Sequence, residues 1–283
     1  MDDESFRGRV AIVTGASSGI GRAVALQLAE QGAFLALAAR DAERLEALKT
    51  ECERGGGKAL AVPTDVAVQE LCQTLVDKTV GHYGKLDMLV NNAGFGVGAR
   101  FQDFIDLSLF MHVMEVNFNG AVFCTYFAIP HLIESKGRIV NVSSLAGRFP
   151  LPYNTPYTAS KFALSGFSDS LRLELANQGV SVTAIYPSWV VTEFHERFQN
   201  KAGKPTGPRG RKIYTKRTMT ADQCAQIILK AAQKRRREVV MQPGKIALWL
   251  KLLAPGLLDK FIVERFFRPA VERIPKREST PME

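Results

Sequence analysis

The stretch "TGASSGIG", residues 14–21, follows an apolar β-branched run and opens a helical pattern. Gly15 permits a tight turn after the predicted strand, Gly19 lets the backbone approach a ligand, and Gly21 lets helix and strand pack closely. The first turn of the helix then offers unpaired N–H groups to an anion such as a pyrophosphate. In this strand–turn–helix context, the glycine-rich turn predicts a dinucleotide-binding unit.

The same alternation of apolar strands and periodic helices continues along the chain. Apolar runs predict seven strands, at 9–15, 34–40, 58–66, 85–94, 137–144, 180–187 and 238–243. Helical periodicity predicts the helices between them, at 19–33, 41–57, 68–84, 107–135, 155–177 and 220–234. Alternating strands and helices form a parallel sheet with helices on both faces. We therefore expect an α/β fold of the Rossmann-type, doubly wound class, with a mostly parallel seven-stranded sheet.

The length of 283 residues suits one large domain with an appendage. We expect a single Rossmann-type domain at 1–244, which includes a substrate loop at about 188–220 whose second half is Gly/Pro-rich and basic. Two apolar helical segments, split by Pro255 and Gly256, follow the last predicted strand. Residues 245–283 are therefore predicted to be a helical extension packed on or beside the domain.

Composition excludes several classes of protein and site. The chain is 46% hydrophobic, which is ample for a buried core. Cys52, Cys72, Cys124 and Cys224 lie far apart without His partners, which argues against a metal site and a disulfide framework and fits a reducing compartment. The acidic start lacks the apolar segment of a secretory signal, and no run reaches the roughly 18 apolar residues of a spanning helix. We expect a cytoplasmic protein.

The net charge of +9 is unevenly distributed along the chain. Residues 1–194 hold 16 Lys/Arg and 20 Asp/Glu, a net of −4, whereas residues 195–283 hold 21 and 8, a net of +13. A uniformly basic nucleic-acid binder would not show this split, and no nucleic-acid-binding motif is recognisable. We therefore expect no nucleic-acid partner.

In "TPYTASKFAL", residues 155–164, Tyr157 and Lys161 stand four apart at the start of a predicted helix. That spacing places both side chains on one face, one turn apart. Tyr is a poor acid or base at neutral pH, with an ordinary pKa of about 10, and a fixed ammonium beside it would lower that pKa. The pair is either a catalytic acid/base or two residues on a solvated helix face.

Four motifs in a fixed order resemble those of the short-chain dehydrogenase/reductase family. They are "TGASSGIG" at 14–21, "NNAG" at 91–94, Ser144, and the Tyr157/Lys161 pair whose Tyr follows that Ser by thirteen residues; "VN" at 116–117 matches the family's further catalytic Asn. The resemblance covers about 6–195 strongly and 220–243 loosely. The tail after 244 lies outside it.

The resemblance implies an oxidoreductase that moves a hydride between C4 of a nicotinamide and a carbonyl carbon. Tyr157 is implied to give or take the proton on the oxygen, and Lys161 to lower the pKa of that Tyr and hold the nicotinamide ribose. Ser144 is implied to hydrogen-bond the substrate oxygen, and the thirteen-residue spacing selects it over Ser143. Asn117 is implied to kink its helix and to hold a water that joins Lys161 to a proton relay.

The end of the second predicted strand indicates NADP(H) as the cofactor. Ala39 is followed by Arg40, and a small neutral residue followed by Arg suits a 2′-phosphate through a charge-assisted contact. In the alternative, Arg40 is solvated and Asp41 binds the ribose. The family's second NADP mark, a basic residue before the middle glycine, is replaced by Ser18. The predicted cofactor-binding residues are Gly15, Ser17, Ser18, Gly19, Ile20, Gly21, Arg40, Asp65, Val66, Asn91, Ala93, Gly94, Tyr157, Lys161, Pro187, Val190 and Thr192.

The segment "YPSWVVTEF", residues 186–194, resembles the family's "PGxxxT" loop beside the nicotinamide, with Ser188 in place of the usual Gly. Trp189 either lines the substrate pocket, as Ser144 is implied to do, or only packs. The tail mixes Leu, Ile, Trp and Phe with Lys and Arg. It is interpreted as a basic amphipathic surface for anionic lipid, as a lid or dimer contact, or as extra core packing.

Relatives with similar basic, apolar extensions reduce steroids, retinoids or long-chain ketones, so we expect an apolar carbonyl or secondary alcohol as substrate. A 3-oxoacyl-thioester reductase is one alternative, against which the long tail counts. A nucleotide-binding protein without chemistry is another, against which Tyr157 and Lys161 count. Family habit predicts a homodimer or homotetramer through the helices at 107–135 and 157–177. The tail predicts a peripheral membrane contact.

Overall fold

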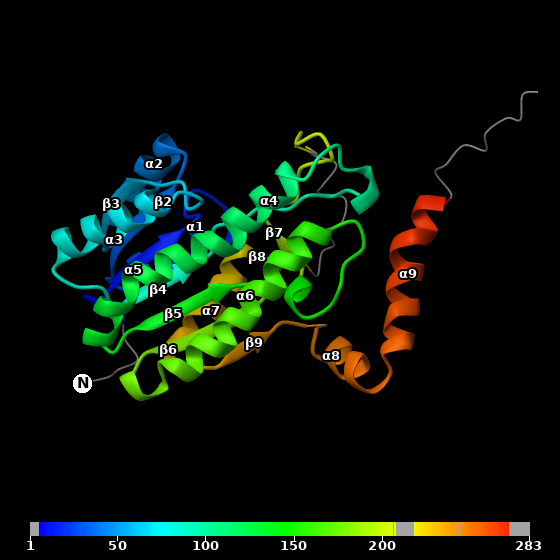
Figure 1. Ribbon diagram of the computed structural model, residues 1–283. Coiled ribbons are helices and arrows are strands. Elements are labelled where there is room, and N and C mark those ends of the chain that lie inside the picture. The colour runs from blue at the N-terminus through cyan, green and yellow to red at the C-terminus, as the bar shows by residue number, and fades with distance from the viewer. Residues whose placement is uncertain (1–5, 206, 208–217, 243, 272–283) are drawn as a thin grey trace, which may run out of the picture.

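The computed structural model describes the chain at 6–205, 207, 218–242 and 244–271, with side chains as far as Glu264. One parallel sheet forms the middle layer, and helices cover both of its faces (Figure 1). The predicted Rossmann-type fold is therefore confirmed. Parts of the predicted substrate loop, at 206 and 208–217, and of the predicted extension, at 272–283, lie outside the described residues.

Seven strands make up the sheet, and every neighbouring pair is parallel. Their order is β3-β2-β1-β4-β5-β6-β9, so the winding direction reverses between β1 and β4. Doubly wound sheets bind ligands at this reversal, outside the carboxyl ends of the strands. The strands are β1 Val10–Thr14, β2 Phe34–Ala39, β3 Lys58–Pro63, β4 Met88–Asn91, β5 Arg138–Val142, β6 Ser181–Tyr186 and β9 Glu238–Val240.

The helices cover the sheet in two layers, which explains why the central strands are buried along their whole length. Helices α1, α2 and α7 share one apolar core with the sheet, and α3, α5 and α6 share the other. The helices are α1 Gly19–Glu30, α2 Ala42–Arg54, α3 Gln69–Tyr83, α4 Ser108–Met114, α5 Gly120–Glu134, α6 Thr155–Glu174, α7 Ala221–Gln233, α8 Gly244–Leu253 and α9 Pro255–Val271.

A π-helical turn interrupts the helix that was expected at 107–135. It occupies Glu115–Asn119 and joins α4 to α5. A π-turn inserts an extra residue into the helical path, which shifts the helix axis and is frequent at functional sites. Asn117 lies inside this turn, where the family resemblance implied a kink.

Two short strands were not predicted, and they define the base of the substrate loop. β7 (Val190–Val191) pairs in parallel with β8 (Met219–Thr220). Because β7 and β8 flank 192–218, their pairing brings both ends of that segment together. α7 begins directly after β8 with the predicted capping box, in which Thr220 and Gln223 each bond the other's backbone N–H through their side chains.

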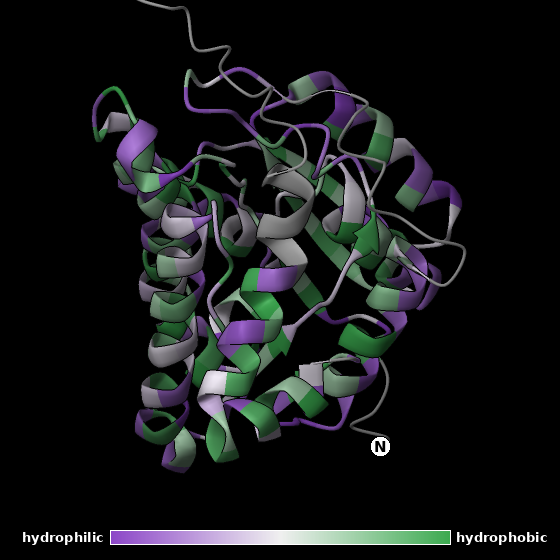
Figure 2. Ribbon diagram, turned by 90° about the vertical axis from the view of Figure 1, so that its right-hand side faces the viewer, coloured by the Kyte–Doolittle hydropathy of each residue, from purple (hydrophilic) through white to green (hydrophobic). Residues whose placement is uncertain are grey.

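Helices α8 and α9 lie on the right-hand side of the molecule in Figure 1, the side that faces the viewer in Figure 2. Leu258 and Ile262 of α9 are buried against Phe149. Lys251 of α8 donates to the carbonyl oxygen of Arg148 at 2.6 Å. One face of the helix pair therefore packs on the rest of the chain. Within the described residues, no helix is long and apolar enough to cross a membrane.

Candidate active site

The glycine-rich turn joins β1 to α1 at the carboxyl edge of the sheet. Gly15 and Gly19 adopt φ angles of 63° and 56°, which favour glycine, and a Cβ on Gly21 would clash with the carbonyl oxygen of Gly15. The side chain of Ser18 precedes α1 without capping it, so the first N–H groups of α1 are available to an anion. The turn therefore fits the predicted phosphate-binding role.

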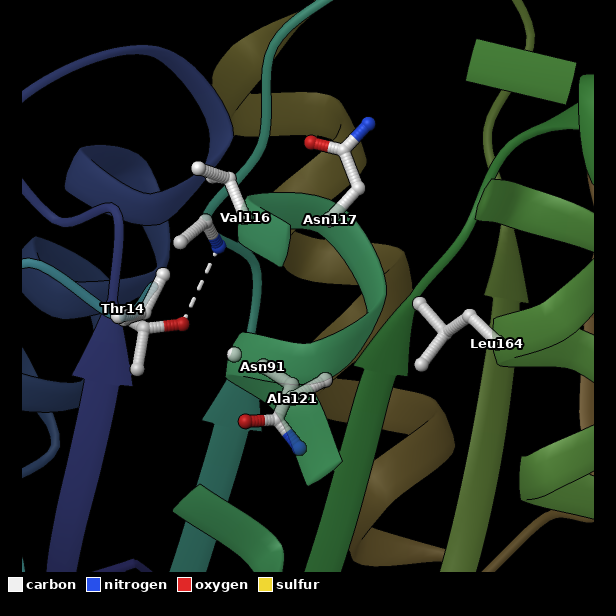
Figure 3. Close-up of a pocket in the computed structure, with 9 residues that line it drawn as sticks. Thr14, Asn91, Val116, Asn117, Ala121 and Leu164 are labelled. Carbon is white, nitrogen blue, oxygen red and sulfur yellow. Dashed lines mark hydrogen bonds between the residues drawn. The ribbon is translucent and has the colours of Figure 1, made fainter. Parts of the chain in front are cut away.

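Thr14 and Asn92 fasten this turn to the segment after β4. Thr14 Oγ1 accepts hydrogen bonds from the backbone N–H groups of Asn92 (2.9 Å) and Ala93 (3.1 Å), the latter drawn in Figure 3. Asn92 Nδ2 donates back to the carbonyl oxygen of Thr14 at 3.0 Å. Neither side chain was singled out from the sequence, although both lie inside the quoted motifs.

Three predicted catalytic side chains meet at the start of α6. Tyr157 and Lys161 are one turn apart and both are buried. Ser144 follows β5 and precedes a short 3-10 turn at Leu145–Gly147. The Ser144 side chain lies within reach of the Tyr157 hydroxyl group and lowers its pKa. Lys161 Nζ donates to the carbonyl oxygen of Val142 at 2.9 Å, which anchors the ammonium at the end of β5.

Burial sets the pKa values of this pair. It raises the pKa of Tyr157 to about 12, because loss of solvation outweighs the hydrogen bond from Ser144. It lowers the pKa of Lys161 to about 8. The expected lowering of the Tyr157 pKa is therefore wrong for this structure, since desolvation disfavours the phenolate more than its surroundings favour it. At pH 7 both side chains keep their protons.

Asn117 connects the segment after β4 to α6. Its Nδ2 donates to the carbonyl oxygen of Phe95 (2.9 Å) and to Ser160 Oγ (3.0 Å), and its Oδ1 accepts from the N–H of Phe95 (2.9 Å). Ser160 in turn donates to the carbonyl oxygen of Tyr157 at 2.8 Å. In Figure 3 the amide points away from Asn91. Asn117 therefore holds the first turn of α6, while its predicted water contact stays a prediction.

Residues 9–203 match the family model described as short chain dehydrogenase, which is more than half of the chain. The chain belongs to the short-chain dehydrogenase family. It is therefore an oxidoreductase that binds a nicotinamide cofactor. The matched segment runs from β1 into the loop after β7 and includes the glycine-rich turn, Tyr157 and Lys161.

Relatives of this short-chain dehydrogenase include plant and archaeal proteins. It is 43% identical over 191 residues to the Arabidopsis thaliana "11-beta-hydroxysteroid dehydrogenase-like 3", covering 67% of this chain but only 62% of that one. It is 36% identical over 262 residues to the Pinus massoniana "11-beta-hydroxysteroid dehydrogenase", covering 90% and 73%. The Thermococcus sibiricus alcohol dehydrogenase, solved with 5-hydroxy-NADP, superposes with a TM-score of 0.71 at 26% identity, covering 83% and 96%.

The side chains after β2 and β3 occupy the nucleotide end of this dehydrogenase. Arg40 follows β2 and is exposed. Asp41 caps α2, because one carboxylate oxygen accepts from the N–H of Arg44 (3.1 Å) and the other pairs with its guanidinium (3.3 Å). Asp65 follows β3, and its carboxylate accepts from the N–H of Ala67 at 3.1 Å. The carboxylate of Asp41 is thus bound to Arg44 at the start of α2, whereas the side chain of Arg40 is exposed to solvent.

Asn91, at the end of β4, is held inside the protein. Its Nδ2 donates to Thr125 Oγ1 (3.0 Å) and Asn141 Oδ1 (2.9 Å), which joins β4 to α5 and β5. Asn91 also lines a cavity of about 10 Å³ with Val66 and Ala93 (Figure 3), the size that one water molecule needs. The structure gives Asn91 a structural role, and its contact with the cofactor stays a prediction.

The predicted "PGxxxT" segment lies between the glycine-rich turn and Ser144. A Cβ on Gly19 would lie 3.2 Å from Thr192 Cγ2, so Thr192 packs directly on the turn. Val190 is buried, and the carbonyl oxygen of Pro187 accepts from the N–H of Leu145 at 3.0 Å. The segment therefore contacts both the glycine-rich turn and Leu145 after β5, although Ser188 replaces the usual glycine.

Two aromatic side chains of the substrate loop cover the candidate acid, and the sequence did not identify them. The rings of Phe194 and Phe198 lie 5.7 and 6.2 Å from the ring of Tyr157. A Cβ on Gly96 would clash with the ring of Phe198, so this glycine makes room for it. Gln199 donates to the carbonyl oxygen of Gly96 at 2.9 Å, which docks the loop. The spacing of four in "FHERF" was the available signal.

Trp189 lies beside this aromatic cover but is not enclosed by it. Its side chain is 43% exposed, and its ring lies 4.9 Å from the ring of His195. Burial lowers the pKa of His195 to about 4, so that ring is neutral at pH 7. The contact with His195 is compatible with both interpretations of Trp189, and its place in a substrate pocket stays a prediction.

The cysteines are free thiols and all four are buried. Cys72 Sγ donates to the carbonyl oxygen of Val66 at 3.4 Å. Across the described part of the chain, no group of three or more His, Cys, Asp or Glu side chains could hold a metal ion.

Proposed function

We propose that this short-chain dehydrogenase is an NADP(H)-dependent oxidoreductase for a lipophilic ketone or the corresponding secondary alcohol. When bound, the nicotinamide supplies or accepts the hydride at the carbonyl carbon. The observation that carries the proposal is the placement of the Ser144 side chain beside the hydroxyl group of the buried Tyr157, with Lys161 one turn away. Two such hydroxyl groups can hold one carbonyl oxygen and pass it one proton.

Each candidate catalytic side chain has a separate task in this proposal. Tyr157, protonated at neutral pH, gives its proton to the substrate oxygen in reduction and recovers it in oxidation. Ser144 donates a second hydrogen bond to the same oxygen and stabilises the charge that develops there. The Lys161 ammonium, 5.8 Å from the centre of the Tyr157 ring, stabilises the phenolate left after proton transfer. Asn117 positions the first turn of α6.

The cofactor would lie along the crevice from the glycine-rich turn to Lys161. The glycine conformations and the uncapped start of α1 support a pyrophosphate there. The residues that we expect to contact the cofactor are Gly15, Ser17, Ser18, Gly19, Ile20, Gly21, Arg40, Asp65, Val66, Asn91, Ala93, Gly94, Tyr157, Lys161, Pro187, Val190 and Thr192.

The choice of NADP(H) over NAD(H) rests on Arg40 and Asp41. Arg40 is exposed beside the end of β2, where its guanidinium can meet a 2′-phosphate. Asp41 caps α2 and pairs with Arg44, which supports the interpretation that it does not bind the ribose. The archaeal alcohol dehydrogenase with the same fold was solved with 5-hydroxy-NADP, which also favours the phosphorylated cofactor.

Arg40→Ala should weaken NADPH binding about tenfold and leave NADH binding within about twofold, because only NADPH carries the 2′-phosphate. Titration calorimetry with both dinucleotides measures the two affinities directly. An equal loss for NADPH and NADH would contradict the cofactor proposal, because Arg40 would then act on the shared part of the nucleotide or on the fold.

A lipophilic substrate is supported by the side chains around Tyr157. Phe194 and Phe198 surround its ring, so a carbonyl that reaches the hydroxyl must pass apolar surface. Relatives named 11-beta-hydroxysteroid dehydrogenase support the same class.

The experiment that tests the function is a screen of NADPH consumption over steroid, long-chain, aromatic and 3-oxoacyl-thioester carbonyls. We expect kcat/KM to be highest for one of the first three. Preference for the thioester would contradict the proposed substrate class. Absence of turnover with every carbonyl, despite tight NADPH binding, would contradict the catalytic proposal.

We also propose a homodimer or homotetramer through α5 and α6. The exposed apolar side chains of Tyr126 on α5 and of Phe162 and Leu173 on α6 support this contact. Sedimentation equilibrium measures the assembly, and a monomer at micromolar concentration would contradict it.

We further propose that the enzyme is cytoplasmic and that the outer face of α8 and α9 makes a peripheral contact with an anionic membrane. Its apolar side chains point to solvent, with Trp249 67% and Leu253 75% exposed, and Lys245 and Lys260 are exposed beside them. An apolar stripe with flanking Lys matches a helix that lies in the headgroup region of a bilayer. The exposed apolar residues of this face are Ile246, Trp249, Leu252, Leu253, Leu257, Phe261 and Val263.

The double variant Trp249→Glu/Leu253→Glu should lose sedimentation with anionic liposomes. The two carboxylates disfavour insertion of this face into the bilayer and are repelled by the anionic headgroups. It should keep its fold, since both side chains are exposed in the wild type. Leu71→Glu on α3 is the matched control, because it adds a carboxylate at an exposed Leu outside this face. Unchanged sedimentation of the double variant would contradict the membrane contact.

A further inference from the structure

Three charged side chains meet where the substrate loop touches the glycine-rich turn. Glu193 Oε2 accepts from Arg44 Nη1 of α2 at 3.1 Å. The same oxygen pairs with Arg197, one turn further along the loop. Arg197 also donates to Ser18 Oγ at 3.0 Å. We call Arg44, Glu193 and Arg197 the charge cluster.

The charge cluster contributes little to folding, so a structural role does not explain it. Its three side chains are between 45% and 48% exposed, and ion pairs at that exposure typically stabilise a protein by about 0–1 kcal/mol. The arrangement instead has the features of an anion site. One carboxylate oxygen receives two guanidinium groups that come from different elements of the fold.

The position of the charge cluster identifies the anion. Ser18, which Arg197 contacts, directly precedes α1, and Thr192 packs on Gly19 beside it. On the other side, Arg44 lies in the first turn of α2, four residues after Arg40, which follows the end of β2. The charge cluster therefore spans the space between the glycine-rich turn and the end of β2, where the adenosine ribose of a dinucleotide lies in this fold.

We propose that the carboxylate of Glu193 occupies the position of the 2′-phosphate of NADP(H), and that Arg44 and Arg197 bind that phosphate when it displaces the carboxylate. The proposal rests on the proposed choice of NADP(H). A phosphate carries more charge and more acceptor oxygens than a carboxylate, and guanidinium groups match it in bidentate geometry. Arg197 then supplies from the loop the basic group that the turn itself lacks at Ser18.

The proposal links the cofactor to the cover of the active site. Arg197 lies next to Phe198 and three residues after Phe194, the two residues that cover Tyr157. A phosphate that holds Arg197 against Ser18 therefore holds these rings over the site. NADH has no 2′-phosphate, so it cannot add this contact to the ones that the loop already makes.

Titration calorimetry of the full chain with 2′,5′-ADP and with 5′-AMP tests the proposal, because only the first carries a 2′-phosphate. Glu193→Gln should bind 2′,5′-ADP about fivefold more tightly than the wild type does, since a competing carboxylate is removed. Arg197→Gln and Arg44→Gln should each bind it about fivefold more weakly. All three variants should bind 5′-AMP as the wild type does.

Glu196→Gln is the matched control, because it makes the same change of charge in the same loop three residues away, and it should leave both affinities unchanged. If the wild type prefers 2′,5′-ADP but the three cluster variants keep its affinity, this inference is overturned and the choice of NADP(H) stands. If the wild type binds both probes equally, the proposed cofactor itself is overturned. An increase in 2′,5′-ADP affinity for Glu196→Gln equal to that for Glu193→Gln also overturns the inference. The increase would then come from the overall charge of the loop and not from the position of Glu193.

Discussion

Tyr157→Phe should reduce kcat for carbonyl reduction about a thousandfold, because it removes the hydroxyl that delivers the proton. The aromatic ring and its contacts with Phe194 and Phe198 are retained in the variant. NADPH binding should stay within about twofold of the wild type, since the other proposed contacts of the cofactor are unchanged. Single-turnover kinetics and titration calorimetry measure the two effects separately.

The matched control for this prediction is Tyr153→Phe, which deletes the same atom four residues earlier, before α6 begins. It should keep most of the activity, because Tyr153 contacts Arg100 rather than Ser144. Near-normal turnover by Tyr157→Phe would mean that the acid lies elsewhere. A loss of NADPH affinity that matches the loss of turnover would mean that Tyr157 acts in binding.

The fold was predictable because its strands are continuous apolar runs. A parallel strand covered by helices on both faces is buried at every position, so β1 and β2 stand out without any alternation. The predicted strand at 85–94 was too long, because after Asn91 the polar groups of Asn92 bind Thr14 instead of extending the sheet. Such long-range contacts leave no periodic signal in the sequence.

The pairing of β7 with β8 was missed for a related reason. Each strand has two residues, and the partners Val190 and Met219 are separated by the whole substrate loop. No local pattern indicates a two-residue strand whose partner lies so far along the chain. The aromatic cover of Tyr157 was missed with it, because that pairing fixes the base of the loop that carries Phe194 and Phe198.

The candidate site was predictable in its members but not in its electrostatics. The spacing of Ser144, Tyr157 and Lys161 placed the three side chains together, as the structure has them. The Tyr157 pKa is raised by burial, and Phe194 and Phe198 from the substrate loop are among the side chains that pack against its ring. The spacing indicates an ammonium beside the ring but says nothing of burial, which is the largest effect on this pKa.

Lys161→Met should lose most of the activity and yet give a more stable protein. Burial lowers the pKa of Lys161 from its ordinary 10.5 to about 8, so a charged ammonium at neutral pH costs the native state about 3 kcal/mol. Met has a similar unbranched shape and removes this cost. It leaves the carbonyl oxygen of Val142 without its donor, a loss of about 1 kcal/mol. We expect a net gain of about 2 kcal/mol in the free energy of unfolding at pH 7.

The pH dependence separates this charge effect from ordinary repacking. Below pH 8, Lys161 is protonated in the folded and the unfolded chain, so the native state bears the full cost of burying the charge. Between pH 8 and 10.5, the unfolded chain keeps a proton that the native state has released, so wild-type stability rises with pH. The advantage of Lys161→Met in urea unfolding should therefore shrink between pH 8 and pH 10.

Lys78→Met, on the exposed side of α3, is the control because it removes the same charge without relieving any burial. Its effect on stability should be small and should not follow the same pH profile. If Lys161→Met proves less stable than the wild type at pH 7, the surroundings of Lys161 stabilise its ammonium. The candidate site would then hold no stored electrostatic cost.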